Sequence, residues 1–142
     1  MNEKYQIIFA NLPWATMTVA ELCALTIPAE ANALLYLCAT APKLVETLAV
    51  MEAWGFLYRT NAALAKSGEV GEWNDWLHLQ HELLLVGRRG KFSPPPASLR
   101  VASVLNPDKI RELIVSWFPN ATKVELFARE NAAGWCIWTP GD

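Results

Sequence analysis

Residues 5–14 read Tyr-Gln-Ile-Ile-Phe-Ala-Asn-Leu-Pro-Trp, and the interpretation of the whole chain starts from this stretch. Its first part, Tyr5–Ala10, is an apolar run of strand length, which is typical of a strand buried on both faces of a parallel sheet. Asn11 and Pro13 then interrupt the run. Because ligands of open parallel sheets bind beyond the carboxyl ends of the strands, the turn Asn11–Trp14 is the first candidate site.

Strand-like and helix-like patterns alternate along the rest of the chain. Four further stretches are predicted to be strands: residues 33–38, 56–66, 83–86 (ended by Gly87) and 123–128. Between them, residues 67–76 and the run Ser93–Pro96 are expected to be loops, since glycine, acidic residues and consecutive prolines disfavour regular structure.

Three segments carry helix signals. Thr18-Val19-Ala20-Glu21 has the spacing of a capping box, and the apolar residues that follow it on one face are Val19, Leu22, Cys23 and Ile27. Pro42 and Gly55 bound a second helix, whose expected inner face is Leu44, Val45, Leu48 and Met51. Asn106 and Pro107 begin a third helix, whose apolar residues are Ile110, Leu113, Ile114, Trp117 and Phe118.

This alternation predicts an α/β sandwich built around a mostly parallel sheet. A chain of 142 residues fits a single domain, 1–142. With 53% hydrophobic and 18% charged residues, the chain is not intrinsically disordered, and its apolar runs are too short to span a membrane. The net charge of −2 gives no overall attraction to nucleic acid, which leaves room for a local basic face.

The cysteines and the N-terminus favour a cytoplasmic protein. Cys23, Cys38 and Cys136 are odd in number and form no Cys-x-x-Cys pair, as expected for reduced thiols, and no signal-peptide pattern begins the chain. His78 and His81 invite a zinc interpretation, but the strand expected directly after them does not place both on one helical face, so no metal is expected. Motifs of dinucleotide-binding, P-loop and α/β-hydrolase proteins do not occur.

The turn Asn11–Trp14 resembles the Asp/Asn-Pro-Pro-aromatic motif of amino-group methyltransferases that use S-adenosylmethionine. Further blocks are similar, in the same order, to the MT-A seventy family of adenine methyltransferases, which includes the mRNA adenosine methyltransferase and many phage and bacterial DNA enzymes. These blocks are Tyr5–Ala10, Thr16–Leu22, Glu52–Phe56, His81–Gly90, Phe118-Pro119, Val124–Arg129 and Gly134–Trp138. By resemblance, the chain is identified as a shortened, partly degenerate member with a Rossmann-like class I methyltransferase sandwich, helices covering both faces of the sheet.

The resemblance implies methyl transfer from S-adenosylmethionine to the 6-amino group of adenine in DNA or RNA. The Asn11 side-chain oxygen and the Leu12 carbonyl would accept hydrogen bonds from the amino group, Pro13 would shape the turn, and Trp14 would stack on the flipped base. The implied cofactor-binding residues are Asn106, Glu125, Leu126, Phe127 and Arg129. For Glu125 and Arg129, a solvated pair at the strand end is an equal alternative.

Three departures from the family weaken this implied site. The active-site loop after Trp14 is nearly absent, and Val104–Asp108 replaces a His-Ser-x-Lys-Pro-Asp segment whose Lys contacts the cosubstrate. The family's Trp-Gly-Asn ending is replaced by Trp138–Asp142. A second hypothesis therefore stands beside the first: a catalytically silent subunit that binds nucleic acid or pairs with an active partner, as a homodimer or heterodimer.

Two groups of surface residues complete the candidates. Arg88, Arg89, Lys91 and Arg100 cluster in and beside a loop, where they form either a phosphate-contacting edge or an ordinary solvated loop. Among the seven tryptophans, Trp54 and Trp117 are expected in the core and Trp135 and Trp138 near the end of the sheet. Trp73 and Trp76, in the acidic loop, would cover the site or a partner surface.

Overall fold

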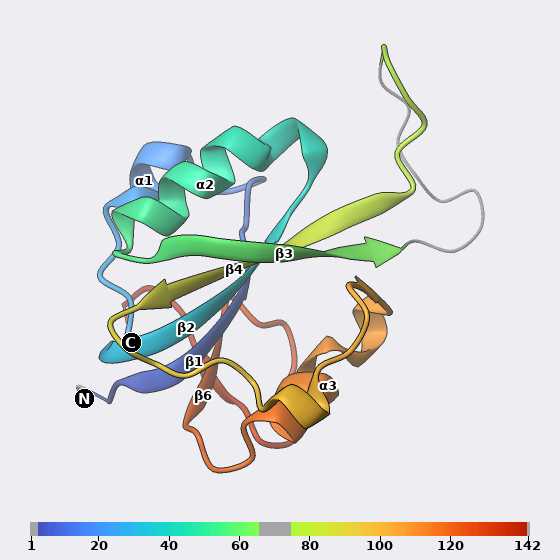
Figure 1. Cartoon of the computed structure of the whole chain (residues 1–142). Helices are drawn as coiled ribbons and strands as arrows, with labels where there is room; N and C mark the ends of the chain where they lie inside the picture. Colours follow the sequence, from blue (N-terminus) through green and yellow to red (C-terminus); the bar gives the residue numbers. More distant parts are fainter. Residues whose placement is uncertain (1–2, 66–74, 142) are drawn as a thin grey trace.

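The computed structural model describes residues 3–65 and 75–141, and a seven-stranded sheet forms its centre (Figure 1). The order of the strands across the sheet is β5-β3-β4-β2-β1-β6-β7. The strands are β1 (Tyr5–Asn11), β2 (Ala29–Ala39), β3 (Leu57–Ala65), β4 (His81–Arg89), β5 (Val104–Leu105), β6 (Lys123–Leu126) and β7 (Cys136–Trp138). Three α-helices accompany them: α1 (Val19–Cys23), α2 (Leu44–Ala53) and α3 (Ile110–Trp117).

The sheet is mostly parallel, as the sequence predicts. Among the described strands, β4 pairs antiparallel with both β2 and β3, and every other pairing is parallel. Only β4 therefore runs against the rest. β3 and β4 are consecutive in the chain and antiparallel, so no crossover helix is needed between them.

Helices cover both faces of the sheet (Figure 1), which confirms the predicted α/β sandwich. Alternate residues of β1 serve the two cores: Ile8 packs toward α1 and α2, whereas Ile7 and Phe9 pack with Ile110 and Ile114 of α3. Burial on both faces explains why Ile7–Ala10 of β1 are all apolar, because neither set of side chains reaches solvent.

The connections reverse direction between β1 and β6. From β1 the chain proceeds through α1 and β2 to α2 and β3 on one side, and α3 on the opposite face then brings it back to β6. The carboxyl ends of β1 and β6 thus meet at a topological switch point, the usual place for a ligand in such sheets.

The helix predictions hold with two corrections. The capping box is present, with Thr18 N–H donating to Glu21 at 2.9 Å and Glu21 N–H donating to Thr18 at 3.1 Å. However, α1 ends at Cys23, so Ile27 lies outside the helix, where the following Pro28 favours extended backbone. Val45 is 77% exposed rather than inward-facing.

The strand predictions err at their boundaries. β2 begins earlier than expected and β4 continues past Gly87 to Arg89. β6 ends at Leu126 instead of residue 128, because Phe127 leaves the strand with φ of 60°. The expected loop at residues 67–76, with Trp73, falls almost entirely outside the described residues.

The described ranges contain neither a membrane-spanning helix nor a cluster of metal-binding side chains. No helix in residues 3–65 and 75–141 is long and apolar enough to cross a membrane. In the same residues, no three side chains of His, Cys, Asp and Glu gather closely enough to hold a metal ion.

Candidate active site

The candidate site is the turn that follows β1 at the switch point. Ala10 of β1 is paired with Leu126 of β6, so Asn11, the last residue of β1, and Phe127, the first residue after β6, lie at the ends of neighbouring parallel strands. Such strands lie about 4.8 Å apart. The structure therefore brings together the two segments that the sequence singles out for base and cofactor binding.

Backbone hydrogen bonds fix the shape of the turn. The Trp14 N–H donates to the Leu12 carbonyl at 3.0 Å, and the N–H groups of Thr16 and Met17 both donate to the Pro13 carbonyl at 3.0 Å. Leu12 is buried in the core beneath the sheet edge. The short connection to α1 is thus an ordered, closed turn.

Asn11 is the exposed polar residue of this turn. Within residues 3–65 and 75–141 its side chain makes no hydrogen bond to the protein. An amide side chain offers an oxygen acceptor and an NH₂ donor, and both are available here to a ligand.

Trp14 is half-buried, and a lysine lies over its ring. The Lys43 Nζ is 5.1 Å from the ring centroid, a cation–π arrangement. Lys43 belongs to a short 3₁₀ helix, Ala41–Lys43, that follows the carboxyl end of β2. Sequence reasoning missed Lys43, although its place just after a predicted strand is a usable signal.

Phe127 has an unusual backbone conformation for a residue with a side chain. Its φ of 60° lies in the left-handed region. The Phe127 N–H donates to the Trp138 carbonyl at 3.0 Å, and the two rings meet edge to face at 6.3 Å. Backbone strain of this kind clusters at ligand-binding sites, and here it sits where the sheet order places a ligand.

Glu125 lies in β6, two residues before Phe127, and is only 4% exposed. Its carboxylate accepts two hydrogen bonds from Arg111 of α3, at 2.6 and 2.5 Å. The Arg111 guanidinium also lies 5.2 Å from the Phe9 ring centroid, and the bonds to Glu125 raise its pKa above the ordinary value. The alternative of a solvated pair between Glu125 and Arg129 is therefore wrong: Glu125 fixes α3 against the sheet, and Arg129 is exposed.

Cys38 occupies the position beside Asn11 in the sheet, paired with it across β1 and β2. Burial raises the pKa of the Cys38 thiol to about 12, and the nearby carboxylates of Glu82 and Glu125 act in the same direction. A thiol with so high a pKa stays protonated at neutral pH and is a poor nucleophile. Cys38 is therefore not a nucleophile of the candidate site at the carboxyl ends of β1 and β6.

Asn106 follows β5, at the other border of the sheet, and caps the 3₁₀ helix Pro107–Lys109. Its side-chain oxygen accepts a hydrogen bond from the Asp108 N–H at 2.9 Å. The predicted N-cap is confirmed, and this use of the oxygen gives Asn106 a structural role at the start of the α3 segment.

The predicted basic cluster divides between the two faces of the sheet. Arg89 turns toward α2, where it donates to the carbonyls of Trp54 and, at 3.3 Å, Ala29, and lies 4.8 Å from the Phe56 ring centroid. Burial lowers the pKa of Arg89. Arg88 and Arg100 instead line a cavity on the opposite face, and Lys91 borders a neighbouring hollow.

The tryptophans near the sheet follow the predictions in most cases. Trp54 is buried, and its indole N–H donates to the Leu22 carbonyl at 2.8 Å. Trp135 is buried 6.0 Å from the Phe9 ring, and Trp138 packs at the end of the sheet beside Phe127. Trp117 is only half-buried, because one side of its ring faces the cavity that Arg88 and Arg100 line.

The residues around the carboxyl ends of β1 and β6 fit S-adenosylmethionine in their chemistry. The partly buried rings of Trp14, Phe127 and Trp138 pack against the core at the sheet edge and offer flat apolar surface suited to an adenine ring. The exposed guanidinium of Arg129, two residues after Phe127, matches a carboxylate. Val104–Asp108, where the adenine methyltransferases that the sequence resembles carry a lysine, contains none.

A mostly parallel sheet covered on both faces by helices, with its candidate site at the switch point, has the α/β Rossmann-like methyltransferase fold. The chain is similar to the type II methyltransferase M.MunI of Mycoplasma sp, with 28% identity over 147 residues. The match takes in 91% of this chain and 60% of M.MunI, so the chain spans less than two thirds of that relative's length. No family model matches the chain. The similarity supports a methyltransferase relationship.

Proposed function

We propose that this protein transfers a methyl group from S-adenosylmethionine to the 6-amino group of adenine in a nucleic acid. The observation that carries the proposal is the turn Asn11–Trp14, which leaves β1 beside Phe127 at the switch point and presents an unengaged Asn11 amide. The similarity to a methyltransferase supports the same reaction class. Adenine as the target base rests on the resemblance of the turn to the adenine-methyltransferase motif.

The residues of the turn suit the chemical problem of methylating an aromatic amine. The lone pair of the 6-amino nitrogen is delocalised into the ring, so acceptors aimed at its hydrogens help the nitrogen pyramidalise. The Asn11 amide oxygen is one acceptor. The Leu12 carbonyl, which receives one bond from the Trp14 N–H, retains a second lone pair to act as the other.

Trp14 would hold the base by stacking. Since Lys43 lies over the ring, the base would stack on the other face of Trp14, with the Lys43 charge near the nucleic-acid backbone. As the N–C bond forms, the S–C bond of the methyl donor breaks, and the amino nitrogen then loses one proton to solvent. S-adenosylmethionine supplies an electrophilic methyl group on a positively charged sulfur. Phe127, Trp138 and Arg129 would orient it at the end of β6.

DNA or RNA is the proposed partner and the cytoplasm the proposed compartment. Lys43, which lies over the Trp14 ring, is a basic side chain available for a phosphate contact beside the turn, whereas Lys91 and Arg100 belong to the segment between β4 and β5. Pairing with a second methyltransferase-fold subunit is part of the proposal as well.

The direct test is methyl transfer to adenine-containing oligonucleotides, with 6-methyladenine detected by mass spectrometry. Asn11→Ala removes one acceptor and should lower the transfer rate about 10²- to 10³-fold, the usual cost of one transition-state hydrogen bond. Asn120→Ala makes the same chemical change at an exposed position before β6, at the opposite end of the sheet, and should leave the rate unchanged. Equal rates for wild type and Asn11→Ala would refute the assignment. No product from the wild type would favour the silent subunit.

A further inference from the structure

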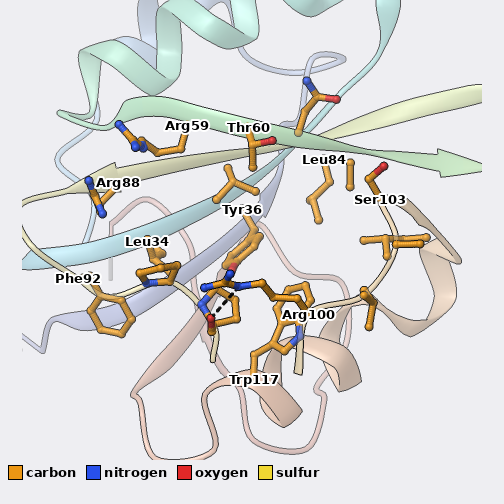
Figure 2. A pocket seen from close by; sticks show the side chains of 18 residues that line it. Leu34, Tyr36, Arg59, Thr60, Leu84, Arg88, Phe92, Arg100, Ser103 and Trp117 are labelled. Carbon is orange, nitrogen blue, oxygen red and sulfur yellow. Dashed lines mark hydrogen bonds between the residues drawn. The ribbon is translucent and has the colours of Figure 1, made fainter. Parts of the chain in front are cut away.

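A second site lies on the α3 face of the sheet, away from the turn Asn11–Trp14. It is a cavity of about 370 Å³ bounded by β2, β3 and β4, by the proline-containing loop after β4, and by Trp117 of α3 (Figure 2). None of residues 11–14 or 126–127 lines it. Its volume is near the lower end of the range for small-ligand pockets, about 300–1,000 Å³.

Three arginines give this cavity a positive character that the chain as a whole lacks. Arg59, Arg88 and Arg100 all line it, and no acidic side chain is found among the described lining residues. The protein carries a net charge of −2, so this concentration of charge does not follow from its composition. Guanidinium groups without a carboxylate partner, around a partly apolar cavity, match the chemistry of an anionic ligand.

A β-bulge places Arg59 among these residues. β3 and β4 pair Tyr58 with Gly87 and Thr60 with Val86, so Arg59 is the extra residue between two pairs. Bulges redirect a side chain and are common beside binding sites. Figure 2 shows Arg59 and Arg88 extending from the neighbouring strands β3 and β4 at one end of the cavity.

The arginines have few bonds to the protein. Within residues 3–65 and 75–141, neither Arg59 nor Arg88 makes a side-chain hydrogen bond or ion pair. Arg100 donates from Nε to the Pro95 carbonyl at 3.2 Å, which holds its stem to the loop and leaves the NH₂ groups of the guanidinium available. All three can therefore bind a ligand without first breaking an ion pair.

Tyr36 supplies a polar atom inside the cavity. The residue is 2% exposed, yet its hydroxyl has no hydrogen-bond partner in the described part of the chain and is not sealed off from solvent. The hydroxyl therefore opens into the cavity, into which Figure 2 shows the side chain projecting from β2. Because the hydroxyl is open to solvent, it can hydrogen-bond to water, and a polar atom of a bound ligand would take the place of that water.

Aromatic rings line the same space. The Trp117 ring centroid lies 6.2 Å from that of Tyr36, with 30° between the ring planes, and the indole N–H donates to the Leu99 carbonyl at 2.8 Å. Phe92 packs on Phe118 and forms another part of the wall. Flat apolar surfaces beside guanidinium groups suit a ligand that combines a planar ring with an anionic group.

We propose that this cavity binds a nucleotide, with the base among Tyr36, Trp117 and Phe92 and the phosphate at the arginines. The ligand would be either a free mononucleotide or one nucleotide unit of a single-stranded nucleic acid, since both present the same chemistry. The proposal goes beyond methyl transfer at the Asn11 turn and does not depend on it, because the two sites share no residue.

Calorimetric titration of the full chain with adenosine 5′-monophosphate, adenosine, inorganic phosphate and a short single-stranded oligonucleotide tests the proposal. Adenosine 5′-monophosphate should bind more tightly than adenosine or phosphate alone. The double variant Arg59→Gln/Arg88→Gln should weaken its binding at least about tenfold, because two charge-assisted contacts are lost. Ala62→Phe, which fills the cavity without changing the charge, should weaken binding to a similar extent.

Two control variants show whether binding is specific to this cavity. Lys109→Gln removes an exposed charge outside the cavity and should leave binding unchanged. The loss of binding caused by Arg59→Gln/Arg88→Gln should be the same in an Asn11→Ala background, so failure of the methyltransferase proposal and failure of this one are distinguishable. Binding of the oligonucleotide alone, with sensitivity to the same cavity variants, would assign the site to a nucleic-acid strand. No binding of either nucleotide ligand, or binding that the arginine and Ala62 variants do not change, would overturn the proposal.

Discussion

Glu125 illustrates how the surroundings of a single residue decide its role. At the end of an expected strand, its carboxylate is as compatible with a solvated position as with cofactor binding. The structure instead buries it and pairs it with Arg111, whose side chain is 38% exposed. A buried carboxylate of this kind depends on its partner, since desolvation of an unpaired charge is costly.

Arg111→Met is therefore expected to destabilise the protein by about 2–4 kcal/mol, because it leaves the Glu125 carboxylate buried without a cation. Chemical denaturation gives the free energy of unfolding. The matched variant is Arg111→Met/Glu125→Gln, which removes both charges and should recover a large part of the loss. A double variant no more stable than Arg111→Met would contradict the assigned role of the pair.

Cys38 gives a second prediction for a single residue, on stability at high pH. Its folded-state pKa of about 12 lies above the ordinary value of 9.0. The unfolded state therefore loses its proton first as the pH rises, and the stability present below pH 9.0 is lost between 9.0 and about 12. The expected slope from this one thiol is about 1.4 kcal/mol per pH unit.

Denaturant unfolding at a series of pH values from about 8 to 10 measures that slope, and Cys38→Ala should reduce it. The pKa of Tyr36 is also raised by burial, which adds a decline in the same direction at still higher pH. Stability that rises over this interval, or an equal slope in Cys38→Ala, would be inconsistent with a buried, protonated thiol.

Among the helices and strands, the sequence predicts the long elements well and the short ones poorly. β1, α2 and α3 carry clear apolar patterns and bounding residues such as Pro42 and Gly55, so their positions follow from local chemistry. β5 and β7 contain two and three residues, too few to show a periodic pattern. Their existence depends on neighbouring strands that offer unpaired backbone groups, which the local sequence does not reveal.

Some features of the candidate site can likewise be predicted from the sequence, and others cannot. The turn Asn11–Trp14 is visible in the sequence because it combines a strand end with a motif. Lys43, the Arg111–Glu125 pair and the inward turn of Arg89 are not, since each depends on which strands become neighbours and on which face a side chain emerges. The bulge at Arg59 likewise comes from the pairing of β3 with β4.

The turn at the end of β4 carries a prediction about backbone packing. Gly90 has φ of +69°, and a Cβ there would collide with Asn32 Oδ1 and lie 2.5 Å from the Ala31 carbonyl oxygen. Gly90→Ala should therefore cost about 2–4 kcal/mol of stability, through backbone strain and collision with main-chain atoms. It should also disturb the hydrogen bond from the Lys91 N–H to Asn32 Oδ1 at 2.8 Å.

Gly141→Ala is the matched control for this substitution. Gly141 also has a positive φ, +99°, but a Cβ there would meet nothing within 4 Å. It should cost about 1 kcal/mol or less, from the conformational term alone. Thermal unfolding compares the two variants, and equal losses would show that crowding at Gly90 has no effect.

In the molecule as a whole, two proposed functions occupy two places on one sheet. The switch point between β1 and β6 would serve methyl transfer, and the arginine-lined cavity on the α3 face would hold a nucleotide. Both sites depend on the same order of strands: β1 beside β6 forms the first, and β2, β3 and β4 line the second.

Methyl transfer requires a bound methyl donor, so the decisive measurement is calorimetric titration of the full chain with S-adenosylmethionine, with S-adenosylhomocysteine in parallel. We expect saturable binding of one molecule per chain, weakened at least about tenfold in Arg129→Gln by loss of a charge-assisted contact and unchanged in Lys109→Gln. Bound ligand at about 100 times its Kd should also raise the free energy of unfolding by about 2.7 kcal/mol. Absence of binding at millimolar ligand would contradict the proposed reaction.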